Sequence, residues 1–195
     1  MLRRELWILA LALGPNLACR SAEPELYDIY RGALEELADA HGMSDEARSQ
    51  NARRYKRVRK RIAAGGVVSA QDHLYAAGAL STSDEMKDLE LARNLAAKAA
   101  ELGEALGNIL VAETTDKILV QQGQRQKYGT QVYLDLPTQL WHLYPADPLT
   151  SDADRASMGL PPLAEMLRLL TLRNDQSEIA SAVSEAIGRR PDGAQ

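Results

Sequence analysis

The chain has 195 residues, of which 45% are hydrophobic and 26% are charged. This composition is typical of a globular protein with a sizeable core and excludes a disordered one. The net charge of -4 argues against nucleic acid as the main partner, because proteins that track phosphates are usually basic. The single cysteine, Cys19, excludes an intramolecular disulfide, and the abundance of Leu and Ala favours helix over sheet.

The first 22 residues resemble an export signal, with two arginines ahead of the apolar run 6–13. That run is too short to cross a bilayer as a helix. Cys19 follows the small Ala18, as at the end of a bacterial lipoprotein signal, although Asn16 stands where such signals usually carry Leu. Lipid attachment at Cys19, cleavage nearby, no modification, and a mature helix docked on the domain all stay open. We expect a leader over 1–22 and an extracytoplasmic protein, periplasmic or attached to the cell envelope.

Two helices are predicted next. The first begins near Pro24, a residue suited to the first turn, and ends at His41-Gly42. The second begins after the N-cap Ser44 and ends before Gly65-Gly66. It carries a basic run: Arg48, Arg53, Arg54, Lys56, Arg57, Arg59, Lys60 and Arg61. Such a helix can bind anionic lipid or phosphates, but the favoured interpretation is a solvated face balanced by Glu35, Glu36 and Asp39.

Two further helices follow, one from the cap Ser69 through Leu80 and one over 85–102 after Ser83. Gly103 ends the second. Successive helix pairs joined by short turns resemble the stacked hairpins of repeat proteins, although the sequence has no repeat at a fixed period.

The stretch 104–131 is predicted to contain the central helix, because its apolar residues leave almost no wholly polar side. Asp116 lies within one apolar stripe of that helix, so its carboxylate needs partners. Gly123 is expected to end the helix, and Gly129 to turn the chain.

The rest of the chain contains two strand-like runs, 131–136 and 139–144, which predict a small hairpin or an extended arm. Short helices are expected over 151–156, from Pro161-Pro162 to about Leu172, and over 178–187. The predicted fold is therefore mainly α, with stacked helical hairpins around a central buried helix. A single helical domain is expected over 23–188, with a disordered tail over 189–195.

One segment carries a family resemblance. Gly123-Gln-Arg-Gln126-Lys-Tyr-Gly-Thr-Gln131 matches a G-x-x-Q-x-[YF]-G-T-Q signature, and the upstream Asp116 and the downstream Leu-Pro-Pro-Leu run after Gly159 fit as well. Over about residues 70–165, the chain resembles an uncharacterised bacterial family whose members are often exported. Relatives often carry Gln-His-Gly where this chain has Ser81-Thr82-Ser83, so no role of that histidine carries over. The resemblance implies an architecture and candidate positions, not a reaction.

Patterns typical of catalysis are missing from the sequence. His41, His73 and His142 are scattered, so no metal site and no cofactor is predicted. The sequence also lacks a nucleophile elbow, a phosphate-binding glycine loop and a zinc-protease motif. A carboxylate pair of Asp116 with Asp135 or Asp147 is conceivable. The favoured interpretation is that Asp116 accepts hydrogen bonds from the turn at 128–131.

These patterns lead to two functional hypotheses. The first is an exported binding or scaffold protein that is not an enzyme, with a protein, peptide or glycan as ligand. The second is a hydrolase-like enzyme that uses Asp116 with Gln126, Gln131 and His142. The candidate ligand-binding or signature residues are Asp116, Lys117, Gln126, Tyr128, Gly129, Thr130 and Gln131. An enzyme should present them around an open pocket, whereas a scaffold should have them covered and mutually satisfied.

Overall fold

The structure is a computed structural model that describes the backbone of residues 24–38 and 45–188 and the side chains of residues 25–33 and 49–176. Over these residues the chain forms seven helices and one two-stranded antiparallel sheet. The elements are α1 (Pro24–Ala38), α2 (Asp45–Ala63), α3 (Ala70–Ser81), α4 (Met86–Glu101), α5 (Leu106–Gln121), β1 (Val132–Asp135), β2 (Leu140–Leu143), α6 (Asp152–Ser157) and α7 (Leu163–Gly188). The prediction of a mainly helical protein with a small hairpin is confirmed.

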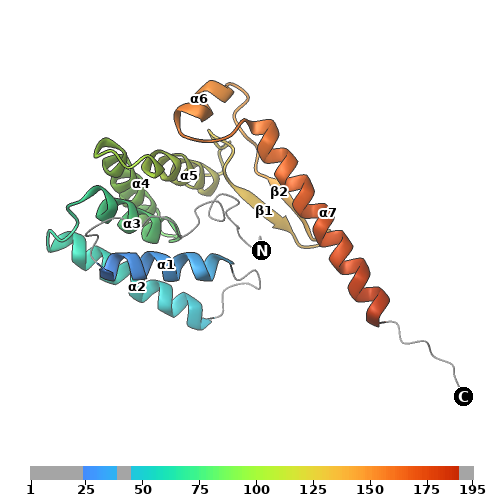
Figure 1. The fold of residues 1–195 in the computed structure, drawn as a ribbon, viewed down its shortest axis with the longest axis horizontal. Helices are drawn as coiled ribbons and strands as arrows, with labels where there is room; N and C mark the ends of the chain where they lie inside the picture. The colour runs from blue at the N-terminus through green and yellow to red at the C-terminus, as the bar shows by residue number, and fades with distance from the viewer. Residues whose placement is uncertain (1–23, 39–44, 189–195) are drawn as a thin grey trace, which may run out of the picture.

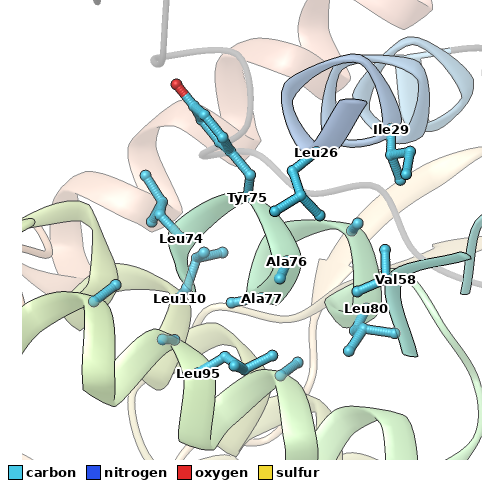
Figure 2. Packing of buried hydrophobic residues seen from close by; sticks show 14 residues of the cluster. Leu26, Ile29, Val58, Leu74, Tyr75, Ala76, Ala77, Leu80, Leu95 and Leu110 are labelled. Carbon is cyan, nitrogen blue, oxygen red and sulfur yellow. The ribbon is translucent and has the colours of Figure 1, made fainter. Parts of the chain in front are cut away.

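Helices α1 to α5 form the body of the molecule (Figure 1). α3 packs against α4, and α4 packs against α5, as the stacked-hairpin prediction requires. α1 and α2 cover the other side of α3. Every residue of α3 from Leu74 to Ser81 is buried, so α3 as well as α5 lies in the interior. Figure 2 shows Leu26 of α1, Val58 of α2 and Leu80 of α3 in this shared core.

Two helix starts are fixed by capping boxes, in which a serine and an aspartate three residues later bond each other's backbone N–H groups. Ser69 and Asp72 form this pair at α3, and Ser151 and Asp154 form it at α6. Ser83 does not cap α4 directly. Its hydroxyl instead donates to the buried Asp88 over 2.9 Å, and Arg59 of α2 binds the same carboxylate, which ties α2 to the start of α4.

The hairpin and α7 form an arm beside the helical body (Figure 1). β1 and β2 pair in the register Val132↔Leu143, Tyr133↔His142, Leu134↔Trp141 and Asp135↔Leu140. Leu170 of α7 packs on this pair, and Asn174 both accepts from the Trp141 amide over 2.8 Å and donates to the Trp141 carbonyl over 3.0 Å.

The predicted break between helices at 172 and 178 is wrong, because α7 is one continuous helix. The run of residues between the two expected helices is polar. In the structure, Asn174 of that run bonds β2 and Arg173 stacks over the Trp141 ring at 4.5 Å, so these polar side chains have partners without a helix break.

Several predictions lie outside the described residues: the leader over 1–22, lipidation of Cys19, the tail over 189–195, and the charge balance by Glu35, Glu36 and Asp39. Within the part of the chain that the structure describes, none of the helices combines the length and apolar character that crossing a membrane requires.

Candidate functional site

Asp116, fully buried on α5, is the centre of the signature segment. Its Oδ1 accepts the amide N–H groups of Lys127 over 2.7 Å and Tyr128 over 2.8 Å. Its Oδ2 accepts the Thr130 amide over 2.9 Å and the Thr130 hydroxyl over 2.8 Å. These bonds confirm the prediction that Asp116 fixes the turn to the helix. A carboxylate offers about four acceptor sites, so Asp116 has no acceptor capacity left.

Gln126 and Gln131 form a second buried layer around the same turn. The Gln126 side-chain oxygen accepts the Gln131 amide over 2.7 Å, and the Gln126 side-chain nitrogen donates to the carbonyls of Gln131 and Tyr144. The Gln131 side chain in turn donates to the Glu113 carbonyl over 3.2 Å and to the Thr130 hydroxyl over 3.0 Å. Both amide side chains therefore bond the chain itself, and together they join α5, the turn and the segment after β2.

Gly129 sits where no other residue fits well. Its φ of +73° lies in the left-handed region that favours glycine. A Cβ there would stand 2.8 Å from Leu163 Cδ1 and 3.0 Å from Arg155 Nη1. The turn is thus covered by α6 and the start of α7, which explains why the signature carries glycine at this position.

Arg155 is a site residue that the sequence did not reveal. Its side chain is 2% exposed, and its Nε donates to the Pro161 carbonyl over 2.8 Å. Nη1 and Nη2 are sealed from solvent and have no hydrogen-bond partner among the described residues. Burial lowers the pKa of Arg155, and the charges of Asp152 and Asp116 oppose that shift. Because water does not reach either nitrogen, the guanidinium functions here as packing over Gly129 rather than as an open anion site.

Glu113 is the second residue that the sequence analysis missed, although it lies one turn before Asp116 on the same helix. It is 6% exposed, and no described group hydrogen-bonds its carboxyl. Burial, followed by the charge of Asp116, raises its pKa to about 8. Burial also raises the pKa of Asp116, against the hydrogen bonds from Tyr128, Thr130 and Lys127. The charge of Glu113 also acts on Tyr30 of α1. Burial, and after it the Glu113 charge, raises the pKa of Tyr30 to about 12.

Lys117 and Tyr128 occupy different positions from the rest of the signature set. The buried Lys117 points to the α3–α4 turn, where its Nζ donates to the Ser81 carbonyl over 3.1 Å and lies 3.9 Å from Asp84. Tyr128 is half-buried, and the Lys127 ammonium lies 5.0 Å from its ring centroid. Lys117 therefore links α5 to the α3–α4 turn, whereas Tyr128 belongs to the turn that Asp116 holds.

The carboxylate pairs considered from the sequence do not form around Asp116. Asp135 accepts the Thr138 hydroxyl in the hairpin turn, and Asp147 accepts the Leu149 amide. His142 lies in β2 with its ring against Tyr133, outside the Asp116 cluster. The carboxyl that the Asp116 charge affects is Glu113, whose pKa is raised by burial and then by that charge. Among the described side chains, no group of three or more His, Cys, Asp and Glu residues could hold a metal ion.

The site as a whole is an enclosed polar knot in which Asp116, Gln126, Thr130 and Gln131 satisfy one another. Each of these four side chains is at most 4% exposed. Buried, fully satisfied networks of this kind rigidify a fold and specify one arrangement of the chain. The arrangement can hold the hairpin, α6 and α7 in place on α5, but it presents none of these side chains to a ligand in solution.

Comparison with known proteins identifies a family. No curated protein and no solved structure matches the chain. A family model described as a family of unknown function (DUF6624) matches residues 42–175, a span that contains the helices α2 to α6 and both strands. That span includes the Asp116 knot, and it extends beyond the 70–165 region of resemblance at both ends. The chain therefore belongs to this family of unknown function, DUF6624.

Proposed function

We propose that this protein is an exported binding or scaffold protein, in which the family signature builds the fold rather than a reaction centre. The observation that carries the proposal is the enclosure of Asp116, Gln126 and Gln131. Hydrogen bonds within the chain take up the Asp116 carboxylate, both ends of the Gln126 amide and the Gln131 NH2 group. A reaction centre needs side chains that can reach a substrate in a concave site. A structural knot needs the opposite, which is full burial with every polar group paired.

The alternative function, a hydrolase-like enzyme using Asp116 with Gln126 and Gln131, has one supporting feature. Two carboxyls with environment-shifted pKa values, Glu113 and Asp116, lie on one face of α5. Asp116 would nevertheless have to give up one of its four hydrogen bonds before it could accept a proton from a substrate. We therefore favour the non-catalytic function.

The arm supports a protein or peptide as the partner, in preference to a glycan. Leu169 and Leu172, one turn apart on α7, are 37% and 44% exposed, and Leu136 at the hairpin end is 42% exposed. Large apolar side chains that gather at a surface mark contacts with other proteins. α7 continues past the hairpin and away from the helical body (Figure 1), which leaves its sides accessible to such a partner.

Site-specific photocrosslinking in intact cells tests the partner. A crosslinker at Leu172 should give a protein adduct, whereas the same group at the exposed Glu101 of α4 serves as the control and should give none. Equal labelling from both positions, or no adduct from Leu172, would contradict a protein partner on α7.

Export and lipid attachment are the second part of the proposal, and they are supported by the sequence over 1–22. The native protein should be recovered from the membrane fraction, with a mature chain that begins at Cys19 and carries a lipid mass. Mass spectrometry of that fraction decides the point. A chain that retains Met1 and occurs only in the cytosolic fraction would contradict export.

A further inference from the structure

The exposed face of α2 carries a stripe of three cations. Arg53, Lys56 and Lys60 are exposed and follow the i, i+3, i+7 spacing of one helix face. None of the three forms a salt bridge with a carboxylate among the residues that the structure describes, although the charge of Lys60, after the hydrogen bond from Arg57, helps to lower the pKa of Glu25. We call these three residues the basic stripe.

Several other exposed cations among the described residues are paired with carboxylates. Arg57 binds Glu25 over 2.9 Å, Lys98 binds Glu101 over 3.0 Å, and Arg168 binds Glu165 over 2.6 Å. Within α2, Arg59 is taken by Asp88 and points inward. The basic stripe differs from these paired cations in that it groups three cations without a salt bridge on one face of a helix.

The orientation of the stripe is fixed by the opposite face of α2. Val58 is fully buried in the core, Asn51 is buried as well, and Tyr55 and Ile62 pack against the core. α2 lies with α1 on the side of the helical body away from α6 (Figure 1). The three cations consequently point away from the body and span about 10 Å of helix.

We propose that the basic stripe docks the protein on the anionic phospholipid headgroups of a membrane. Charge complementarity argues for this occupant: α2 has eight basic and two acidic residues, a formal charge of +6, in a chain of net charge -4. Because the rest of the chain is acidic overall, an anionic bilayer attracts this face in preference to the acidic remainder. Nucleic acid is disfavoured, since three cations neutralise few phosphates and give weak binding at physiological salt.

The inference deepens the proposed envelope location but does not depend on Cys19. α1, whose helix begins at Pro24, packs against α2, so a chain anchored a few residues earlier would have the stripe near the membrane. Mass spectrometry of the native chain tests the lipid anchor, whereas vesicle binding tests the basic stripe. If one of the two results is negative, the other can still be interpreted.

The experiment compares binding of the full chain to phosphatidylcholine vesicles with binding to vesicles containing about one third phosphatidylglycerol, because only the second carry negative charge. The ratio of the two partition coefficients reports the electrostatic part of binding, because the apolar leader is present in every variant and binds both kinds of vesicle. The test variant is Arg53→Gln/Lys56→Gln/Lys60→Gln. The control variant, Lys87→Gln/Lys98→Gln/Arg168→Gln, removes the same charge from exposed cations that are paired.

Each basic residue near an anionic surface raises binding about fivefold, so the stripe accounts for a factor on the order of 100. We expect the ratio of the anionic to the neutral partition coefficient to be at least tenfold lower for the test variant than for the wild type. For the control variant it should be lower by less than threefold. The wild-type preference should vanish in about 1 M NaCl, where the Debye length is about 3 Å. An equal fall in both variants, or an unchanged ratio in the test variant, would overturn the proposal. So would duplex DNA binding that the test variant loses while its vesicle binding stays the same.

Discussion

Replacement of Asp116 by alanine probes the polar knot at its centre. The substitution removes the acceptor of the Lys127, Tyr128 and Thr130 amides and of the Thr130 hydroxyl. The bonds to Thr130 are buried, whereas those to Lys127 and Tyr128 are partly buried, so water can replace the second pair more readily.

The expected loss follows from this difference in burial. A buried donor left without a partner costs about 1–3 kcal/mol, and a hydrogen bond to a charged acceptor contributes about 1.5–3 kcal/mol. Part of this loss of stability is offset, because the variant no longer pays the desolvation of a buried carboxyl, which in the wild type raises the pKa of Asp116. We expect Asp116→Ala to lower the free energy of unfolding by about 3 kcal/mol, which corresponds to roughly 6–12 °C in Tm for a chain of this size.

Asp116→Asn should lose less. The single carbonyl oxygen of the asparagine can keep two of the four bonds. Its NH2 group can donate to the Thr130 hydroxyl, but it cannot bond the Thr130 amide, because both groups are donors. The expected loss is about 1–3 kcal/mol. The control is Glu101→Ala, which removes an exposed ion pair with Lys98 and should cost less than about 0.5 kcal/mol.

Thermal melts and urea titrations of the wild type and the three variants, run at one pH above 6, give these values. An unchanged or higher Tm for both Asp116 variants would refute the structural role and would favour a catalytic carboxylate, since functional groups often destabilise the fold that carries them.

Two further predictions concern neighbours of Asp116. Since the folded-state pKa of Glu113, about 8, lies above its ordinary value of 4.5, the stability associated with this carboxyl is fully present below about pH 4.5 and is lost as the pH rises through 8. Glu113→Gln keeps an uncharged side chain at every pH. In urea titrations at pH 5 and pH 8, the free energy of unfolding of the variant relative to the wild type should therefore be about 1–3 kcal/mol higher at pH 8 than at pH 5. An identical pH dependence in both proteins would contradict the burial argument. Gly129→Ala should destabilise by about 1–3 kcal/mol more than Gly123→Ala, because both residues have φ near +72° but only a Cβ at Gly129 meets Leu163 and Arg155. Equal melting temperatures of the two glycine variants would show that the cover over the turn does not constrain it.

The local signals in the sequence located most of the helices. Ser69 was predicted to cap a helix, and it is the N-cap of α3 in the structure. The short helix expected over 151–156 is also present, as α6, with Ser151 as its N-cap. Gly123 ends α5 with a φ of +72°, as its position after the last apolar residue indicated. These features depend on residues within one or two turns of one another, which is why a single sequence reveals them.

Long-range contacts account for what the sequence did not reveal. The α7 helix was divided at its polar run, because nothing near Asn174 shows that Trp141 is its partner. Arg155 comes to Gly129 only through the folding of α6 onto the turn, so periodicity could not identify it. Glu113 is different: its place one turn from Asp116 was visible in the sequence, but its burial became apparent only in the folded structure.

The central claim is that the family signature forms a closed, hydrogen-bonded unit, and amide hydrogen exchange of the wild-type protein tests it most directly. The Thr130 and Gln131 amides lie outside every helix and strand, yet they donate to the buried side chains of Asp116 and Gln126 over 2.9 and 2.7 Å. We expect their protection to approach that of the core amides of α5, while the amide of the exposed Thr138 in the hairpin turn, which donates no hydrogen bond to a described residue, exchanges rapidly. Exchange of the Thr130 and Gln131 amides as fast as that of Thr138 would contradict the account.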